Sequence, residues 1–133
     1  MMEYRGMKSI KTDCRALYVE DSDDTRIEVA SYLDYILKET YVASNGNDGL
    51  SIYKKFKPDV VILDLNIPPL NGIELSRELK KIDQAIPIII TTAYNETNYR
   101  KALSDMGITD ILIKPFLLDK LKDSIIHCTE QHS

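Results

Sequence analysis

Charged and hydroxyl side chains follow short runs of branched aliphatic residues at several points in this chain of 133 residues. Three carboxylates, two hydroxyls and one ammonium group stand in such positions: Glu20, Asp21, Asp64, Thr91, Thr92 and Lys114. If the apolar runs are parallel strands, their carboxyl ends meet at the edge where open α/β sheets bind ligands. The sequence therefore predicts that these groups share one site. Side chains alternate along a strand, so only one of the two threonines is expected to reach it.

The predicted chemistry of this group is metal-assisted phosphoryl transfer. Crowded carboxylates repel one another, and a hard divalent cation with oxygen ligands relieves that repulsion. Mg²⁺ is the expected occupant, and Mn²⁺ or Ca²⁺ could substitute in the same site. Once a cation holds Asp64, its carboxylate is a positioned nucleophile, while the metal, Lys114 and one threonine hydroxyl can stabilise the transferring group. The expected product is an aspartyl phosphate.

Five strands, each followed by a helix, are predicted to position these groups. The strands are expected at 15–20, 40–43, 60–64, 86–91 and 110–113. The helices are expected at about 23–38, 47–56, 73–82, 95–106 and 117–127. Ser22 is a predicted N-cap, and Gly107 is predicted to end the fourth helix. The alternation of strands and helices predicts an α/β fold around a parallel sheet.

Length and composition indicate one folded domain. The chain is 44% hydrophobic, which is enough to bury a single core. Residues 14–128 are predicted to form this domain, between a flexible N-terminal tail at 1–13 and a C-terminal tail at 129–133. Cys14 and Cys128 are interpreted as incidental reduced thiols, and His127 and His132 as solvated side chains.

The charge pattern and the hydropathy pattern exclude two classes of partner. The net charge is −4, and no basic run is available to contact a phosphate backbone, so direct nucleic-acid binding is not expected. No apolar run approaches the roughly 20 residues of a membrane span, and the start of the chain lacks the apolar stretch of a signal peptide. A cytoplasmic protein without membrane contact is therefore predicted.

Four short motifs lie in order at the ends of the predicted strands. They are VED at 19–21, LDLNIPPLNG at 63–72, TA at 92–93 and KPF at 114–116. Together they resemble the receiver domain of bacterial two-component response regulators, the CheY-like superfamily, over about 15–127. The resemblance implies a doubly wound, flavodoxin-like (βα)5 fold, with helices on both faces of a five-stranded parallel sheet in the order 2-1-3-4-5.

The resemblance also implies a function in a phosphorelay. Asp64 would accept a phosphoryl group from a histidine kinase or a histidine phosphotransfer protein in a magnesium-dependent reaction. The chain would catalyse only its own phosphorylation and dephosphorylation, so it is not expected to be an enzyme. Phosphorylation would change the face formed by the fourth helix, the fifth strand and the fifth helix, where an unknown output protein or domain would bind.

The family resemblance assigns a role to each residue of the site. Asp21 and Asp64 would bind the magnesium ion directly, together with the backbone carbonyl of Asn66, and Glu20 would act through water. The phosphoryl oxygens would be contacted by two further residues, Thr92 and Lys114. The loop after the acceptor would be shaped by Pro68 and Gly72, and the Lys114–Pro115 peptide would be cis.

One position departs from the family pattern. Ile111 stands three residues before Lys114, where better-known members carry Tyr or Phe. It is predicted to be a core residue that fills space without a hydroxyl group or a ring edge. Tyr94 and Asn66 flank the predicted site and are expected to tune the lifetime of the phosphoryl group.

Two other functions remain open from the sequence. A phosphate-independent interaction or dimerisation module is one, although such relatives typically lose acceptor, metal or lysine residues that this chain keeps. A magnesium-dependent phosphohydrolase with Asp64 as its nucleophile is the other. The dehalogenase-like pattern for that chemistry has a second aspartate at position 66, where this chain has Asn66.

Overall fold

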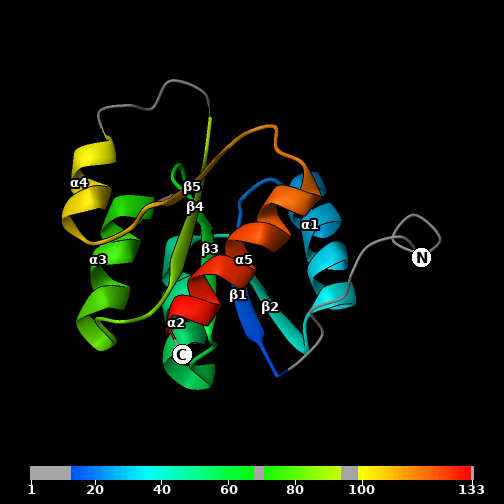
Figure 1. Ribbon diagram of the computed structural model, residues 1–133, viewed down its shortest axis with the longest axis horizontal. Coiled ribbons are helices and arrows are strands. Elements are labelled where there is room, and N and C mark those ends of the chain that lie inside the picture. Colours follow the sequence, from blue (N-terminus) through cyan, green and yellow to red (C-terminus); the bar gives the residue numbers. More distant parts are fainter. Residues whose placement is uncertain (1–12, 68–70, 94–98, 133) are drawn as a thin grey trace.

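The computed structural model describes residues 13–67, 71–93 and 99–132, and its five parallel strands lie in the order β2-β1-β3-β4-β5 (Figure 1). The strands are β1 (Arg15–Val19), β2 (Glu39–Ala43), β3 (Val60–Asp64), β4 (Ile88–Thr92) and β5 (Asp110–Ile113). The helices are α1 (Asp23–Ile36), α2 (Gly46–Phe56), α3 (Gly72–Ile82), α4 (Arg100–Asp105) and α5 (Leu118–His132). The predicted fold class and strand order are confirmed.

Helices cover both faces of the sheet because the buried strands are apolar on both sides. Leu17, Leu63 and Ile90 belong to one hydrophobic cluster, which contains residues of α2, α3 and α4. Their strand neighbours Tyr18 and Ile62 belong to a second cluster, which contains residues of α1 and α5. These clusters define an α2–α4 face and an α1/α5 face of the sheet, as expected for parallel strands buried on both sides.

Capping hydrogen bonds fix the start of α1 and the end of α4. Ser22 caps α1 by accepting a hydrogen bond from the Thr25 amide, as the sequence predicted. Gly107 ends α4 with a positive φ of 77°. Its amide donates to Ser104, and the next amide donates to Leu103, which is the double hydrogen bond of a Schellman motif.

The boundaries of several elements differ from the prediction, and the differences at β4 and α5 have a structural explanation. Strand β4 begins at Ile88 rather than at 86, because Pro87 has no N–H for the ladder and the Ile86 amide turns back to Asp83. Helix α5 continues to His132, so residues 129–132, predicted as a tail, are helical. No Gly or Pro interrupts this stretch, and the Thr129 hydroxyl donates to the Ile125 carbonyl at 2.6 Å.

Several predictions fall on residues outside the described part of the chain. These are residues 1–12 of the N-terminal tail, Pro68, Tyr94 and the first residues of the fourth predicted helix. Within 13–67, 71–93 and 99–132, no helix has the length and apolar character needed to cross a membrane.

Cys14, Cys128 and His127, for which the sequence predicts no function, have specific environments in the structure. Cys14 and Cys128 are free and partly buried. Burial raises the pKa of Cys14 to about 11 and that of Cys128 to about 12, so both thiols are poor nucleophiles. The prediction that His127 is simply solvated is incomplete, because its Nδ1 lies 3.5 Å from Oδ1 of Asp110 on β5.

Candidate functional site

Backbone hydrogen bonds keep the carboxyl ends of neighbouring strands in register. The sheet ladders continue one residue past the strands: the Glu20 amide donates to Ala43 at 3.0 Å, and the Leu65 amide donates to Thr91 at 2.8 Å. The Lys114 amide likewise donates to Thr92 at 2.8 Å. The residues predicted to carry the chemistry therefore leave one edge of the sheet from fixed backbone positions.

Lys114 joins two buried carboxylates at this edge. Its Nζ lies 2.8 Å from Glu20 Oε1 and 2.9 Å from Asp64 Oδ2. Glu20 is 1% exposed and Asp64 is 4% exposed, whereas the Lys114 side chain is 28% exposed. The three residues come from the ends of β1, β3 and β5, so the structure brings together groups separated by up to 94 positions.

A third carboxylate completes an all-oxygen cluster. One oxygen each from Glu20, Asp21 and Asp64 lies within 4.8 Å of the other two. Asp21 is exposed, so the cluster opens to solvent on that side. Carboxylate oxygens at this spacing fit the ligand preference of a hard divalent cation.

The electrostatics of the site follow from burial and from Lys114. Burial raises the pKa of Asp64 above its usual value, although the Lys114 ammonium works in the opposite direction. Burial disfavours the charged form of Lys114, but its hydrogen bonds to Glu20 and Asp64 outweigh this effect and raise its pKa. Lys114 is therefore firmly protonated, and Asp64 takes up a proton more readily than an exposed aspartate.

The loop after β1 is held by contacts that the sequence did not reveal. The Ser22 amide donates to Glu20 Oε2 at 3.0 Å. Arg26, on the first turns of α1, donates from Nη1 to the Glu20 carbonyl at 2.8 Å and pairs with Asp23 through Nη2. The only signal for Arg26 was its position four residues after the N-cap, where its side chain can turn back over the loop.

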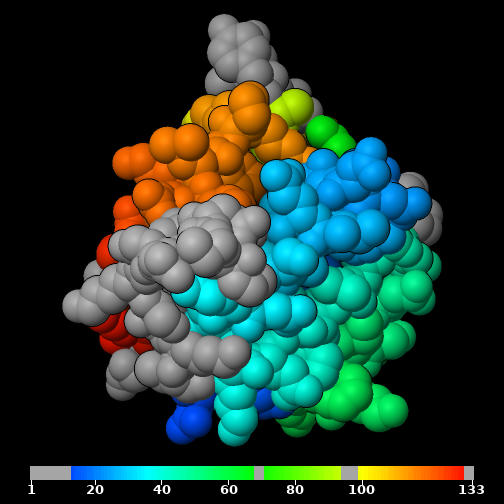
Figure 2. All heavy atoms as spheres, turned by 90° about the vertical axis from the view of Figure 1, so that its right-hand side faces the viewer, coloured from blue at the N-terminus to red at the C-terminus, as the bar shows by residue number. Residues whose placement is uncertain are grey.

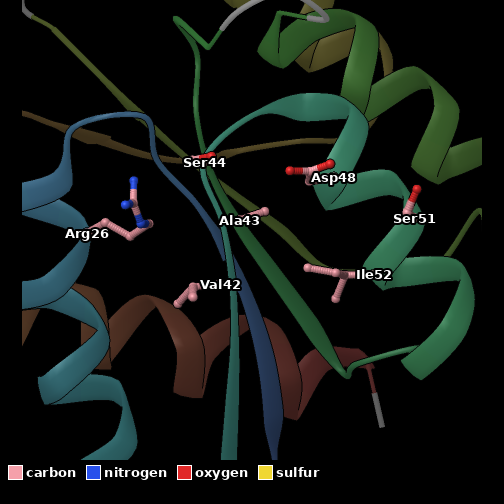
Figure 3. Close-up of a pocket in the computed structure, with 7 residues that line it drawn as sticks. All are labelled: Arg26, Val42, Ala43, Ser44, Asp48, Ser51 and Ile52. Atoms are coloured by element: carbon pink, nitrogen blue, oxygen red, sulfur yellow. The ribbon is translucent and has the colours of Figure 1, made fainter.

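A cavity of about 380 Å³ lies beside this loop, between α1, the end of β2 and α2 (Figure 3). In Figure 3 the Arg26 side chain extends from α1 toward the loop after β1. Asp48, on the opposite wall, accepts a hydrogen bond from Asn45 Nδ2 at 3.0 Å. The two charged side chains that line the cavity, Arg26 and Asp48, are thus both hydrogen-bonded within the protein. Arg26 holds the backbone of Glu20 in place.

The two threonines of β4 lie on opposite faces of the sheet, as predicted. Thr91 pairs in register with Asp64 and continues the alternation that places Ile89 on the α1/α5 face. Thr91 is fully buried, and its hydroxyl has no hydrogen-bond partner. Thr92 follows Ile90 toward the other face, and its hydroxyl donates to the Ala93 carbonyl at 3.2 Å.

The loop after Asp64 depends on a close backbone approach at Gly72. The Gly72 amide donates to the Leu65 carbonyl at 2.9 Å. A Cβ at this position would lie 2.7 Å from Leu65 Cα and 2.8 Å from the Asp64 carbonyl oxygen, so only glycine fits. The Asn66 amide lies 3.4 Å from Asp64 Oδ1. The Lys114–Pro115 peptide is cis, as predicted.

Ile111 and Tyr18 lie behind the site on opposite faces. Ile111 is partly buried and packs against the α2–α4 cluster, so it lies at the margin of the core rather than inside it. Tyr18 is fully buried on the α1/α5 face, and sequence reasoning missed it. Burial, followed by the charges of Glu20 and Asp64, raises its pKa far above the usual value. The available signal was its position two residues before Glu20, which places both side chains on one face.

Comparison with known proteins supports the family suggested by the motifs. The family model described as "Response regulator receiver domain" matches residues 16–126. Sporulation initiation phosphotransferase F of Bacillus subtilis is 34% identical over 111 residues, covering 84% of this chain and 90% of that protein. Regulatory protein AtoC of Escherichia coli is 34% identical over 107 residues, but the chain spans only 23% of its length.

Solved structures agree with this relationship. A response regulator receiver domain protein from Clostridium thermocellum superposes with a TM-score of 0.84 at 26% identity, covering 89% of this chain and 95% of that one. The chemotaxis response regulator CheY4 of Vibrio cholerae gives a TM-score of 0.78 at 28% identity, covering 88% and 99%. Together with the arrangement of Glu20, Asp64 and Lys114, these matches show that the chain belongs to the response regulator receiver domains of two-component systems.

Proposed function

We propose that this chain is a phosphorylation-controlled switch in which Asp64 accepts a phosphoryl group. The observation that carries the proposal is the ammonium group of Lys114 between two buried carboxylates, Glu20 and Asp64, beside exposed Asp21. Burying neighbouring carboxylates destabilises the folded protein, because their negative charges repel and lose their hydration. Clusters of this kind are typical of functional sites. Asp64 is the nucleophile of the group because it closes the central strand β3 and lies between the other two strand ends.

The proposed metal ligands follow from the donor set. Asp21 and Asp64 would hold Mg²⁺ with the backbone carbonyl of Asn66, and Glu20 would act through water. When bound, the cation supplies positive charge to the phosphoryl oxygens. Mn²⁺ or Ca²⁺ has the same preference for oxygen ligands and would compete for the site.

The proposed chemistry is a direct displacement at phosphorus. An ionised Asp64 oxygen forms a bond to the phosphorus atom while the bond to the donor breaks, and the donor leaves with the electron pair. The donor is a phosphohistidine imidazole of a kinase or phosphotransfer protein, or the acetate of acetyl phosphate. Lys114 turns its hydrogen bonding from Glu20 and Asp64 to the new phosphoryl oxygens, and Thr92 rotates away from Ala93 to bond a second oxygen.

The proposed output is a change in the surface around β5. Thr92 and Ile111 share the α2–α4 face, so rotation of Thr92 opens space that Ile111 can fill. Such a shift changes the surface formed by α4, β5 and α5, where an output protein or domain would bind. Under this proposal the chain processes only its own phosphoryl group and does not turn over a separate substrate.

The test is intact-mass measurement after incubation with acetyl phosphate and Mg²⁺. The wild-type chain is expected to gain one phosphoryl group, and Asp64→Asn and metal-free samples are expected to gain none. Without an adduct on the wild type, the switch proposal fails and the phosphate-independent interaction module becomes the better reading. Continuous hydrolysis of unrelated phosphate esters would instead identify a phosphohydrolase.

A further inference from the structure

Tyr18 carries a buried hydroxyl whose presence the resting structure does not explain. The residue is 0% exposed, and its hydroxyl makes no hydrogen bond of normal geometry. Leaving a buried hydroxyl without a partner costs roughly 1–3 kcal/mol, whereas a phenylalanine of nearly the same shape avoids the cost. A hydroxyl kept at such a cost indicates a partner in another state of the protein.

Glu20 is the group that this hydroxyl faces. Tyr18 and Glu20 are two residues apart at the end of β1, so their side chains leave the same face of the sheet. The Glu20 carboxylate is close enough to act on the hydroxyl both by its charge and as a hydrogen-bond acceptor, and Asp64 and Arg26 also lie within electrostatic range. The Tyr18 hydroxyl is thus poised beside Glu20 without completing a bond.

Both oxygens of Glu20 already have donors in the resting structure. Oε1 accepts from Lys114 Nζ at 2.8 Å, and Oε2 accepts from the Ser22 amide at 3.0 Å. If Lys114 turns to a phosphoryl group, Oε1 loses its donor while Glu20 stays 1% exposed. A buried carboxylate that loses its charged partner is strongly destabilised unless another donor replaces it.

We propose that Tyr18 is a positioning residue that donates its hydroxyl hydrogen to Glu20 whenever Lys114 leaves this carboxylate. The inference rests on the proposed function, since phosphorylation is the event that draws Lys114 away. The exchange of donors keeps Glu20 charged and oriented toward the cation without moving the backbone of β1. Neither bond breaking nor proton transfer is needed, because tyrosine remains a protonated donor throughout.

The exchange can be tested on the unphosphorylated chain by a double-mutant cycle. Lys114→Met removes the resting donor permanently, so the Tyr18 hydroxyl is expected to bond Glu20 in that background. Tyr18→Phe should leave the unfolding midpoint unchanged or raise it in the wild type, and lower it in Lys114→Met. Tyr53→Phe is the matched control, because Tyr53 is buried in the other cluster and lines a cavity with Lys57 and Pro58.

The outcomes separate this inference from the proposed function. Equal effects of Tyr18→Phe in both backgrounds overturn the exchange, even if acetyl phosphate labels the wild type. A lower unfolding midpoint in the Lys114→Met background, with an unchanged or higher one in the wild type, supports it, even if labelling fails. Should Lys114→Met alone not fold, Lys114→Gln serves as the background with the same expected sign. A double variant that unfolds while Tyr53→Phe/Lys114→Met folds also supports the exchange.

Discussion

Lys114 is the residue on which the electrostatics of the site depends most. It offsets the charge of two carboxylates that are almost fully buried, and it takes that position only because β1, β3 and β5 end at the same edge. Nothing in the sequence fixes which oxygens it contacts, since that depends on side-chain rotamers. Removing the ammonium group should therefore have opposite effects on folding and on cation binding.

Replacement of Lys114 by methionine is expected to destabilise the metal-free chain and tighten its hold on Mg²⁺. Loss of one partner from a buried ion pair costs about 3 kcal/mol, the low end of the range, since Lys114 is partly exposed. Unfolding in the presence of a chelator measures the first effect, and calorimetric titration with Mg²⁺ measures the second. A variant that binds Mg²⁺ more weakly than the wild type would contradict this electrostatic account.

The raised pKa of Asp64 predicts a pH-dependent gain in stability for Asp64→Asn. Burial makes the ionised carboxylate unfavourable in the folded state, so the metal-free variant should unfold roughly 2–4 °C higher at neutral pH. As the pH falls through the folded-state pKa, the wild type takes up a proton and the difference should disappear. Thermal unfolding between neutral and acidic pH tests this, with exposed Asp105→Asn as the control. If the difference in unfolding temperature between Asp64→Asn and the wild type grew on acidification, the pKa of Asp64 would not be raised in the folded state.

At the scale of elements, the site depends on how tightly α3 packs against the end of β3. The capping residue Asn71 accepts from the Glu74 amide, and Glu74 reaches back to the Asn71 amide, which fixes the first turn of α3. Gly72 then lies against the backbone of Asp64 and Leu65. The start of α3 and the end of β3 thus share one tightly packed junction.

Gly72→Ala is expected to disturb this junction and to cost more stability than Gly49→Ala. The added methyl group at Gly72 meets backbone atoms at 2.7 and 2.8 Å, so the helix must shift at a cost of about 1–3 kcal/mol. At Gly49 the nearest atom is Val19 Cγ2 at 2.9 Å, a side-chain atom rather than backbone, and alanine favours the helix by about 1 kcal/mol, which offsets part of the cost of the close contact. Chemical unfolding of both variants measures the difference, and equal losses would refute the backbone explanation.

The elements also show what the sequence could and could not predict. The bounds of β3 and β5 were predicted correctly because charged residues bound a short apolar run in each: Asp64 ends the run in β3, and Asp110 and Lys114 flank the run in β5. The start of β4 was predicted two residues too early, because the residues on both sides of Pro87 are apolar isoleucines. Only the backbone hydrogen bonds between strands show where pairing starts. The convergence of Glu20, Asp64 and Lys114 followed from strand order, but Tyr18 and Arg26 did not, since their contacts depend on local side-chain geometry.

At the scale of the whole molecule, the chain is a receiver module whose partners must be recognised on its surface. It spans 90% of the Bacillus subtilis relative but less than half of the MprA regulators that it matches. Figure 2 shows α1 and the segment from β5 into α5 side by side on one face. Each carries an exposed apolar side chain: Ile27 in α1 is 65% exposed, and Leu117, three residues after Lys114, is 70% exposed.

These two side chains predict where a protein phosphodonor approaches. The double variant Ile27→Ser/Leu117→Ser is expected to slow phosphoryl transfer from a histidine kinase or phosphotransfer protein about tenfold, the equivalent of roughly 1.4 kcal/mol of lost apolar contact. Transfer from acetyl phosphate should stay unchanged, since the site itself is intact. Ile82→Ser is the control, because this exposed residue lies at the end of α3. Equal slowing with both donors would place the defect in the site rather than in docking.

The central claim is that Asp64 itself carries the phosphoryl group, and mapping the modified residue tests it most directly. After labelling with acetyl phosphate and Mg²⁺, borohydride reduction converts an aspartyl phosphate to homoserine, which peptide mass spectrometry locates in the sequence. The account predicts homoserine at position 64 alone, and no homoserine in the Asp64→Asn variant treated in parallel. Homoserine at Asp21 or at another aspartate, or labelling that persists in Asp64→Asn, would contradict it.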